Sequence, residues 1–187
     1  MVKIKSCVFI SGTGTNLKAL IQNSRSYNFP INIKLVISDK KNAVGLKLAK
    51  KYSIASKIIN PKDNLFEIKV LNKLKEENIT LICLAGYMKI LSKNFIKNFN
   101  GKIINIHPSL LPKYRGLNTF SKILKNKEKM TGCTIHHVNE NLDSGKIILK
   151  KKFDILENEN VNTLKIKTQK KEYKAFSEAI IKLYMMN

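Results

Sequence analysis

Residues 7–21 read Cys-Val-Phe-Ile-Ser-Gly-Thr-Gly-Thr-Asn-Leu-Lys-Ala-Leu-Ile, and their pattern changes twice along the stretch. Residues 7–10 are a continuous apolar run, which is typical of a strand covered on both faces of a parallel sheet. Residues 11–16 contain only glycines, hydroxyl side chains and one amide. The apolar residues within 17–21 then recur at helical spacing. A strand, a glycine-rich turn and a helix in this order predict the first unit of an α/β fold.

The same alternation continues along the chain. Further strands are expected at 31–38, 54–59, 81–85, 103–107, 131–138 and 147–149. Further helices are expected at 44–52, 65–75, 92–100 and 161–186, with a short helix through 123 and 124. Short connections between alternating strands and helices indicate a doubly wound sheet. We therefore predict an α/β fold in a single domain over residues 1–187, Rossmann-like, with a mostly parallel twisted sheet and helices on both faces.

The turn at 12–16 has the chemistry of an anion site. Its glycines let backbone N–H groups approach an anion closely, its hydroxyls add donors, and the following helix N-terminus supplies partial positive charge. A dinucleotide fingerprint matches poorly, because Leu17 stands where the third glycine should be. The P-loop sequence Gly-Lys-Ser/Thr is missing as well. The turn is predicted to bind phosphate, and a plain tight turn is the alternative.

Residues 103–116, Ile-Ile-Asn-Ile-His-Pro-Ser-Leu-Leu-Pro-Lys-Tyr-Arg-Gly, carry a second polar pattern. Asn105 and His107 are two positions apart, so in a strand their side chains point the same way. Pro108 cannot donate to a sheet ladder, so the strand should end there. Strand ends are where open parallel sheets bind ligands. A structural, hydrogen-bonded histidine is the plain alternative.

The string Asn-x-His-Pro-Ser-Leu-Leu-Pro at 105–112, followed by Leu-Asp-Ser-Gly at 142–145, resembles the signature of the folate-dependent formyltransferases. The resemblance reaches from residue 10 to about 176. It implies a transferase of one-carbon metabolism that moves a formyl group from its cosubstrate, 10-formyltetrahydrofolate, to the amine of glycinamide ribonucleotide in de novo purine biosynthesis, without a metal. On this resemblance the catalytic residues are Asn105, His107 and Asp143, with His136 in support.

The resemblance also assigns substrate contacts. Phosphate and ribose fall to Gly12, Thr13, Gly14, Thr15, Asn16 and Glu172, and folate falls to Met88, Lys89, Ile90, Leu91, Asn105 and Asn141. The family arginine for the folate tail is missing, and Lys62 is the nearest candidate. As alternatives, 88–91 could cap the core, and the glutamate could lie on a solvated helix face.

The implied mechanism gives each catalytic side chain one task. Asn105 is expected to donate to the oxyanion that forms on the formyl group. His107, as imidazolium, would stabilise the same charge and act as the general acid. Asp143 would raise the pKa of His107, orient its ring and accept the amine proton through water. An ordinary turn aspartate is the alternative for Asp143.

Other formyl-folate enzymes stay open as alternatives: a methionyl-tRNA or sugar-nucleotide formyltransferase, or a formyltetrahydrofolate hydrolase. These enzymes share the three catalytic residues. Arg115 makes the loop that contains it resemble the loop of the methionyl-tRNA and sugar-nucleotide formyltransferases. The turn at 12–16 and the lack of an extra domain favour glycinamide ribonucleotide.

The net charge of +22 at face value suggests a nucleic-acid partner. Only Arg25 and Arg115 are arginines, and the lysines are spread along the chain, so a basic nucleic-acid-binding module is a remote alternative. Cys7, Cys83 and Cys133 are odd in number and predict reduced, buried thiols rather than disulfides or a metal site. No run is long enough for a membrane span, and no secretory leader is recognised. We expect a cytoplasmic protein, as a monomer or weak homodimer.

Overall fold

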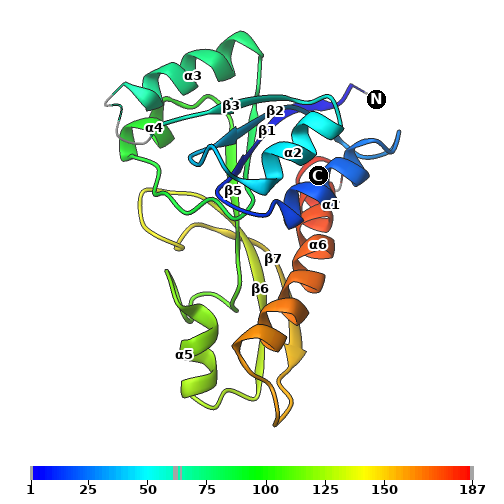
Figure 1. Cartoon of the computed structure of the whole chain (residues 1–187), viewed down its shortest axis with the longest axis vertical. Helices are drawn as coiled ribbons and strands as arrows, with labels where there is room; N and C mark the ends of the chain where they lie inside the picture. Colours follow the sequence, from blue (N-terminus) through cyan, green and yellow to red (C-terminus); the bar gives the residue numbers. More distant parts are fainter. Residues whose placement is uncertain (1, 61–62, 64, 186–187) are drawn as a thin grey trace. The chain divides into compact units, whose positions relative to one another are not determined.

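The computed structural model describes residues 2–60, 63 and 65–185 (Figure 1). The strands in this part of the chain are β1 (Ile4–Ile10), β2 (Ile31–Ser38), β3 (Ala55–Ile58), β4 (Leu81–Leu84), β5 (Lys102–His107), β6 (Met130–His137) and β7 (Ile147–Asp154). The helices are α1 (Thr15–Ser24), α2 (Val44–Lys51), α3 (Phe66–Glu76), α4 (Lys93–Asn98), α5 (Thr119–Lys125) and α6 (Val161–Met185).

The strands form one sheet in the order β3-β2-β1-β4-β5-β6-β7. β1 pairs in parallel with β2 and β4, β2 pairs in parallel with β3, and β7 runs antiparallel to β6. The predicted α/β class with a mostly parallel sheet is therefore confirmed. Strand β7 is longer than the apolar run that predicted it, because it continues through Lys150–152 with alternating exposure as an edge strand.

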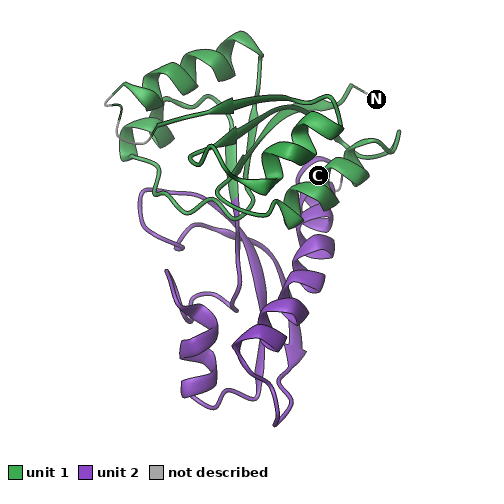
Figure 2. Ribbon diagram, viewed as in Figure 1, with its two compact units in different colours: residues 1–104 green, residues 105–187 purple. Residues whose placement is uncertain are grey.

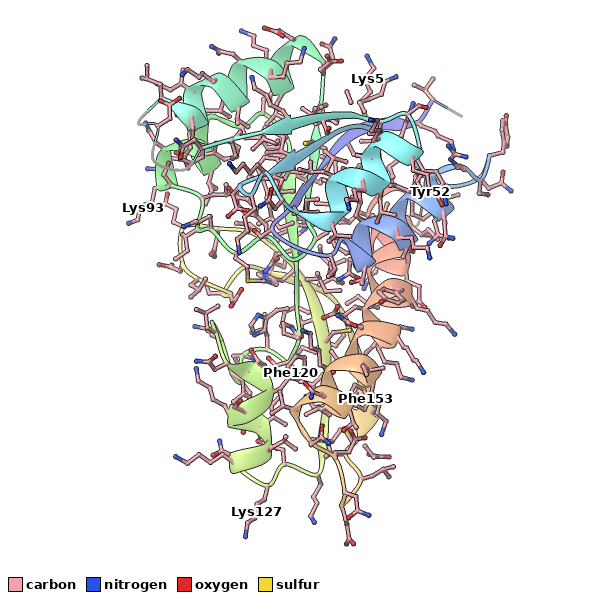
Figure 3. All side chains as sticks on the ribbon, viewed as in Figure 1. Lys5, Tyr52, Lys93, Phe120, Lys127 and Phe153 are labelled. Atoms are coloured by element: carbon pink, nitrogen blue, oxygen red, sulfur yellow. The ribbon has the colours of Figure 1, made fainter. Side chains whose placement is uncertain are left out.

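The chain divides into two compact units, residues 1–104 and 105–187 (Figure 2). A single domain over the whole chain stays a prediction. In each unit lysines project outward from several elements, as Lys5, Lys93 and Lys127 do in Figure 3.

In the first unit, Figure 1 shows α1 and α2 on one face of the strands and α3 and α4 on the other. Large apolar side chains that are almost fully buried fill both sides of β1; they include Phe9, Ile10, Leu17, Ile37 and Leu74. The chain runs outward from β1 through β2 to β3 and then returns to pair β4 with the other edge of β1. The carboxyl ends of β1 and β4 thus meet at a topological switch point, where open α/β sheets bind ligands.

In the second unit, α6 packs against β6 and β7, and α5 contacts α6. The inner face of α6 is apolar and buried at Leu164, Phe176 and Ile180, opposite the buried Cys133 and Ile135 of β6. This packing fixes the end of β6, from which the loop at 138–146 returns to β7. None of the helices described is both long and apolar enough to cross a membrane.

Candidate active site

In the second unit the structure brings Asn105, His107 and Asp143 together. Asn105 and His107 lie on β5 at the predicted spacing of two, and the Nδ1 atom of His107 is 3.2 Å from the Oδ2 atom of Asp143. Both members of this pair are buried. Asp143 itself has a left-handed backbone, with φ of 48°. Gly145 lets the loop pass close to β6, because a Cβ atom there would lie 1.8 Å from the carbonyl oxygen of His137.

The carboxylate of Asp143 is held by donors on both of its oxygens. Oδ2 accepts a hydrogen bond from the Gly116 N–H at 2.9 Å, and Oδ1 accepts one from Asn105 Nδ2 at 3.4 Å. Burial by itself raises the pKa of Asp143, but its interactions with His136, the Gly116 N–H and His107 together outweigh burial and bring the pKa below its ordinary value. Asp143 is therefore ionised at neutral pH and can accept a proton only weakly.

His107 has an acceptor at each ring nitrogen. Its Nε2 atom is 2.7 Å from the carbonyl oxygen of Tyr114, and its Nδ1 atom faces Asp143. A carbonyl oxygen can only accept, so Nε2 carries a hydrogen. Both contacts are hydrogen bonds when the ring is an imidazolium, which donates from both nitrogens.

Asp143 raises the pKa of His107 as predicted, but the net pKa of His107 lies below its ordinary value. Burial lowers the pKa below 6.5, while Asp143 and the Tyr114 carbonyl act against burial without cancelling it. The sequence showed the carboxylate partner but not the depth at which the ring is buried. Without substrate, His107 therefore loses its proton at a lower pH than a free histidine does.

His136 lies nearer the centre of the cluster than a supporting role implies. Its Nδ1 atom is 2.9 Å from the carbonyl oxygen of His137, so Nδ1 carries a hydrogen. Its Nε2 atom is 3.2 Å from Asn105 Nδ2 and 3.6 Å from Asp143 Oδ1. When Nε2 carries no hydrogen, it accepts from the Asn105 amide, and this contact sets which end of that amide faces the carboxylate.

The turn at 12–16 lies in the first unit, at the end of β1. Gly14 precedes α1 with a left-handed φ of 74°. A Cβ atom on Gly14 would lie 2.7 Å from the Cα atom of Gly45, whose N–H donates to the Gly12 carbonyl at 3.0 Å. The turn is thus closely packed against the start of α2. The first N–H groups of a helix have no partner within that helix, so α1 presents donors here.

The segment at 88–91 is tied to the same turn within the first unit. The Ser11 N–H donates to the Gly86 carbonyl at 3.2 Å, and Ser11 Oγ accepts from the Met88 N–H at 2.8 Å. Met88 and Ile90 are 61% and 76% exposed, whereas Leu91 is 5% exposed. The alternative of a core cap therefore applies to Leu91, and the other two apolar side chains are open to a ligand.

The remaining predicted contacts are scattered. Glu172 is buried on α6 near Cys133, whose pKa rises to about 12 through burial and the glutamate charge. The alternative of a solvated helix face for Glu172 is therefore wrong. Asn141 is exposed on the loop before β7, and Lys62 lies outside the described residues.

Sequence reasoning missed the two backbone groups that hold the His107–Asp143 pair, the Tyr114 carbonyl and the Gly116 N–H. Backbone groups leave no trace in residue types, and the glycine at 116, with φ of 75°, was the one available signal of an unusual turn. Within the described residues, no three His, Cys, Asp or Glu side chains are arranged to hold a metal ion.

A family model for the formyl transferases matches residues 4–180. The chain belongs to the formyl transferase family. It is 40% identical over 176 residues to the phosphoribosylglycinamide formyltransferase of Haemophilus influenzae, which covers 92% of this chain and 83% of that protein. It is also similar to a crystal structure of phosphoribosylglycinamide formyltransferase from Brucella melitensis, with a TM-score of 0.92 and 37% identity over 97% of this chain and 96% of that one.

Longer relatives of this formyl transferase chain occur as well. It is 40% identical over 182 residues to the trifunctional purine biosynthetic protein adenosine-3 of Gallus gallus. That match covers 95% of this chain and 18% of the relative, so the chain spans less than a fifth of the trifunctional protein.

Proposed function

We propose that this protein transfers the formyl group of 10-formyltetrahydrofolate to the amine of glycinamide ribonucleotide, as a step of purine biosynthesis. The observation that carries the proposal is the cluster that half-buried Asn105 forms with the buried His107 and Asp143 in a formyl transferase chain. Relatives that this chain matches over most of their length carry the name phosphoribosylglycinamide formyltransferase.

The reaction needs an oxyanion donor, a proton donor and a proton acceptor. The amine attacks the formyl carbon, a C–N bond forms, and negative charge develops on the formyl oxygen. The bond from carbon to N10 then breaks, N10 leaves with a proton, and the attacking amine loses one. Atoms and charge balance without any covalent enzyme intermediate.

Asn105 supplies the oxyanion donor. Its Nδ2 group has two hydrogens, one toward His136 at 3.2 Å and one toward Asp143 at 3.4 Å. The second contact is longer and weaker, so it is the one to exchange for the formyl oxygen. A fixed donor of this kind contributes about 2.7 to 4 kcal/mol of transition-state stabilisation in comparable sites.

When it is an imidazolium, His107 supplies the proton on Nδ1 to N10, since Nε2 donates to the Tyr114 carbonyl. Asp143 stabilises that cation across the 3.2 Å contact and fixes the ring plane. Burial lowers the pKa of His107 in the site without substrate. The anionic charge that develops during the reaction raises this pKa and so favours the imidazolium. The amine proton leaves to water beside Asp143.

The substrate contacts are proposed residue by residue, within each unit by itself. The turn at 12–16 binds the ribonucleotide phosphate through its backbone N–H groups, and Glu172 accepts from the ribose. Exposed Met88 and Ile90 give apolar contacts for the pterin ring, and Asn141 and Lys62 contact the folate.

We also propose a cytoplasmic location, as a monomer or weak homodimer. Cys7, Cys83 and Cys133 are all buried free thiols, which suits a reducing compartment.

A coupled absorbance assay tests the proposed function. Purified protein is mixed with 10-formyltetrahydrofolate and either glycinamide ribonucleotide, methionyl-tRNA, a sugar nucleotide amine or buffer alone. The proposal expects tetrahydrofolate only with the ribonucleotide, and none with the His107→Ala variant. Turnover without an acceptor would instead make the protein a hydrolase, and turnover with another acceptor would overturn the assigned substrate.

A further inference from the structure

One hydrogen bond of His107 has no task in the transfer chemistry, the contact of 2.7 Å between its Nε2 atom and the Tyr114 carbonyl. The proton on Nε2 points at this oxygen. The Tyr114 carbonyl at Nε2 and the Asp143 carboxylate at Nδ1 together hold the ring at both nitrogens. Reactive groups must be held within fractions of an ångström and a few tens of degrees of the productive geometry. Any contact that holds the Tyr114 carbonyl in place therefore also holds the His107 ring in place.

A single turn at 114–116 reaches both members of the pair. The Tyr114 carbonyl contacts His107, and two residues later the Gly116 N–H donates to Asp143 at 2.9 Å. Tyr114 has a left-handed backbone with φ of 59°, which is costly for a large side chain. The surrounding structure must therefore hold this turn in place.

The side chain of Tyr114 provides that anchor. Its hydroxyl donates to Glu128 Oε1 at 2.7 Å and accepts from Asn126 Nδ2 at 2.9 Å. Glu128 lies shortly after α5, where its carboxylate also meets the Nζ atom of Lys113 at 2.8 Å. A hydrogen bond to a carboxylate is stronger than one between neutral groups, so the Tyr114–Glu128 bond contributes most to holding the Tyr114 side chain in place.

We propose that Tyr114 is a positioning residue for the transfer reaction: its hydroxyl, held by Glu128, fixes the backbone carbonyl that orients the His107 ring. The kinetic part of this inference rests on the proposed function, while the orientation of the ring does not. Tyr114 itself is assigned no substrate contact, and it acts only through the backbone of its own turn.

The test compares four variants that separate the hydroxyl contact from its neighbours. Tyr114→Phe removes the hydroxyl and keeps the ring. Glu128→Ala removes its acceptor, and Glu128→Gln keeps an acceptor oxygen while removing the charge. Lys113→Ala is the matched control, because it removes an exposed ion pair on the same carboxylate and leaves the hydroxyl bond intact.

The first readout is the ¹⁵N spectrum of the His107 ring over a pH series, which needs no substrate. The chain has three histidines, so the His107 signals are those lost in His107→Gln. The charged or titratable groups that influence the ring are Asp143, His136 and Lys122, and none of them is altered. Since the Tyr114 carbonyl raises the pKa of His107, we expect the pKa to fall in Tyr114→Phe and Glu128→Ala, and to stay unchanged in the other two.

The second readout is steady-state kinetics. We expect kcat about five- to tenfold lower in Tyr114→Phe and Glu128→Ala, with KM for both substrates within about twofold. The double variant should be no slower than Tyr114→Phe alone, because that variant already lacks the Tyr114–Glu128 contact that Glu128→Ala removes. Unchanged His107 signals in folded Tyr114→Phe would overturn the proposal even if kcat fell, and a response to Lys113→Ala equal to that of Tyr114→Phe would assign the effect to surface charge instead. If no variant and no wild-type protein transfers formyl groups, the spectra still decide the positioning role.

Discussion

Replacing Asp143 by asparagine removes one negative charge and almost no volume. The amide oxygen can face the Gly116 N–H and His107, but the amide NH₂ then faces Asn105 Nδ2, another donor. The reverse orientation puts two donors against each other at Gly116. Neither orientation satisfies the whole cluster, so the ring of His107 loses both its counter-charge and part of its alignment.

The size of the effect follows from the distance. His107 Nδ1 and Asp143 Oδ2 are 3.2 Å apart, and two unit charges about 4 Å apart interact by about 4 kcal/mol at an effective dielectric constant near 20. The pKa of His107 falls further when this attraction is lost. The amide dipole restores part of it, so kcat should fall about 30- to 300-fold. Substrate binding is assigned elsewhere, and KM should change less than about threefold.

The assay is steady-state release of tetrahydrofolate with both substrates varied, from about pH 5.5 to 8.5 so as to span the free-histidine pKa, together with a thermal unfolding curve. Asp154→Asn is the control, because it changes an exposed carboxylate at the end of β7. An Asp143→Asn protein that is folded and turns over like the wild type at every pH would refute the role of this carboxylate. A higher KM with an unchanged kcat would assign Asp143 to substrate binding instead of catalysis.

Three further outcomes are expected. The folded pKa of His107 is lowered below its unfolded value of 6.5, so the free energy of unfolding should fall as the pH drops from 6.5 through the folded pKa. In urea titrations, His107→Gln should flatten this loss between about pH 7 and pH 5, a range well above the pH at which Asp143 titrates. Gly14→Ala should lower stability by about 1 to 3 kcal/mol, because the residue has φ of 74° and a Cβ atom would lie 2.7 Å from Gly45 Cα; Gly12→Ala, with nothing within 4 Å of the new atom, should leave the melting temperature unchanged. Ile90→Ser should raise KM for the folate without loss of stability, since the side chain is 76% exposed, whereas Leu91→Ala, at 5% exposed, should cost about 2 to 5 kcal/mol; equal melting temperatures for the two variants would contradict this division.

The fold was predictable because most of its strands, turns and helices have their own local sequence signal. The apolar run at 7–10, the glycines of the turn and the spacing of Leu17 and Leu20 agree on strand, turn and helix, and the observed β1 and α1 follow them. The extension of β7 was not predictable from apolarity, because an edge strand exposes alternate side chains and here they are lysines.

For the site, side-chain spacing predicted that Asn105 and His107 share a face, and the structure has both on β5 in one cluster with Asp143. What the sequence could not supply was the balance of burial against charge at His107, which needs the surrounding packing. The Tyr114 carbonyl was equally hidden, because every residue has one and only the left-handed turn aims this one at the ring.

The most direct test of the formyl transfer follows the transferred atom itself. Protein is incubated with glycinamide ribonucleotide and 10-formyltetrahydrofolate that carries ¹³C in the formyl group, and the mixture is followed by ¹³C NMR. We expect the label to appear as a formamide on the ribonucleotide, one for each tetrahydrofolate released, and we expect His107→Ala to stop its appearance. Label found as free formate, or label that stays on the folate while the wild-type protein is folded, would contradict this expectation.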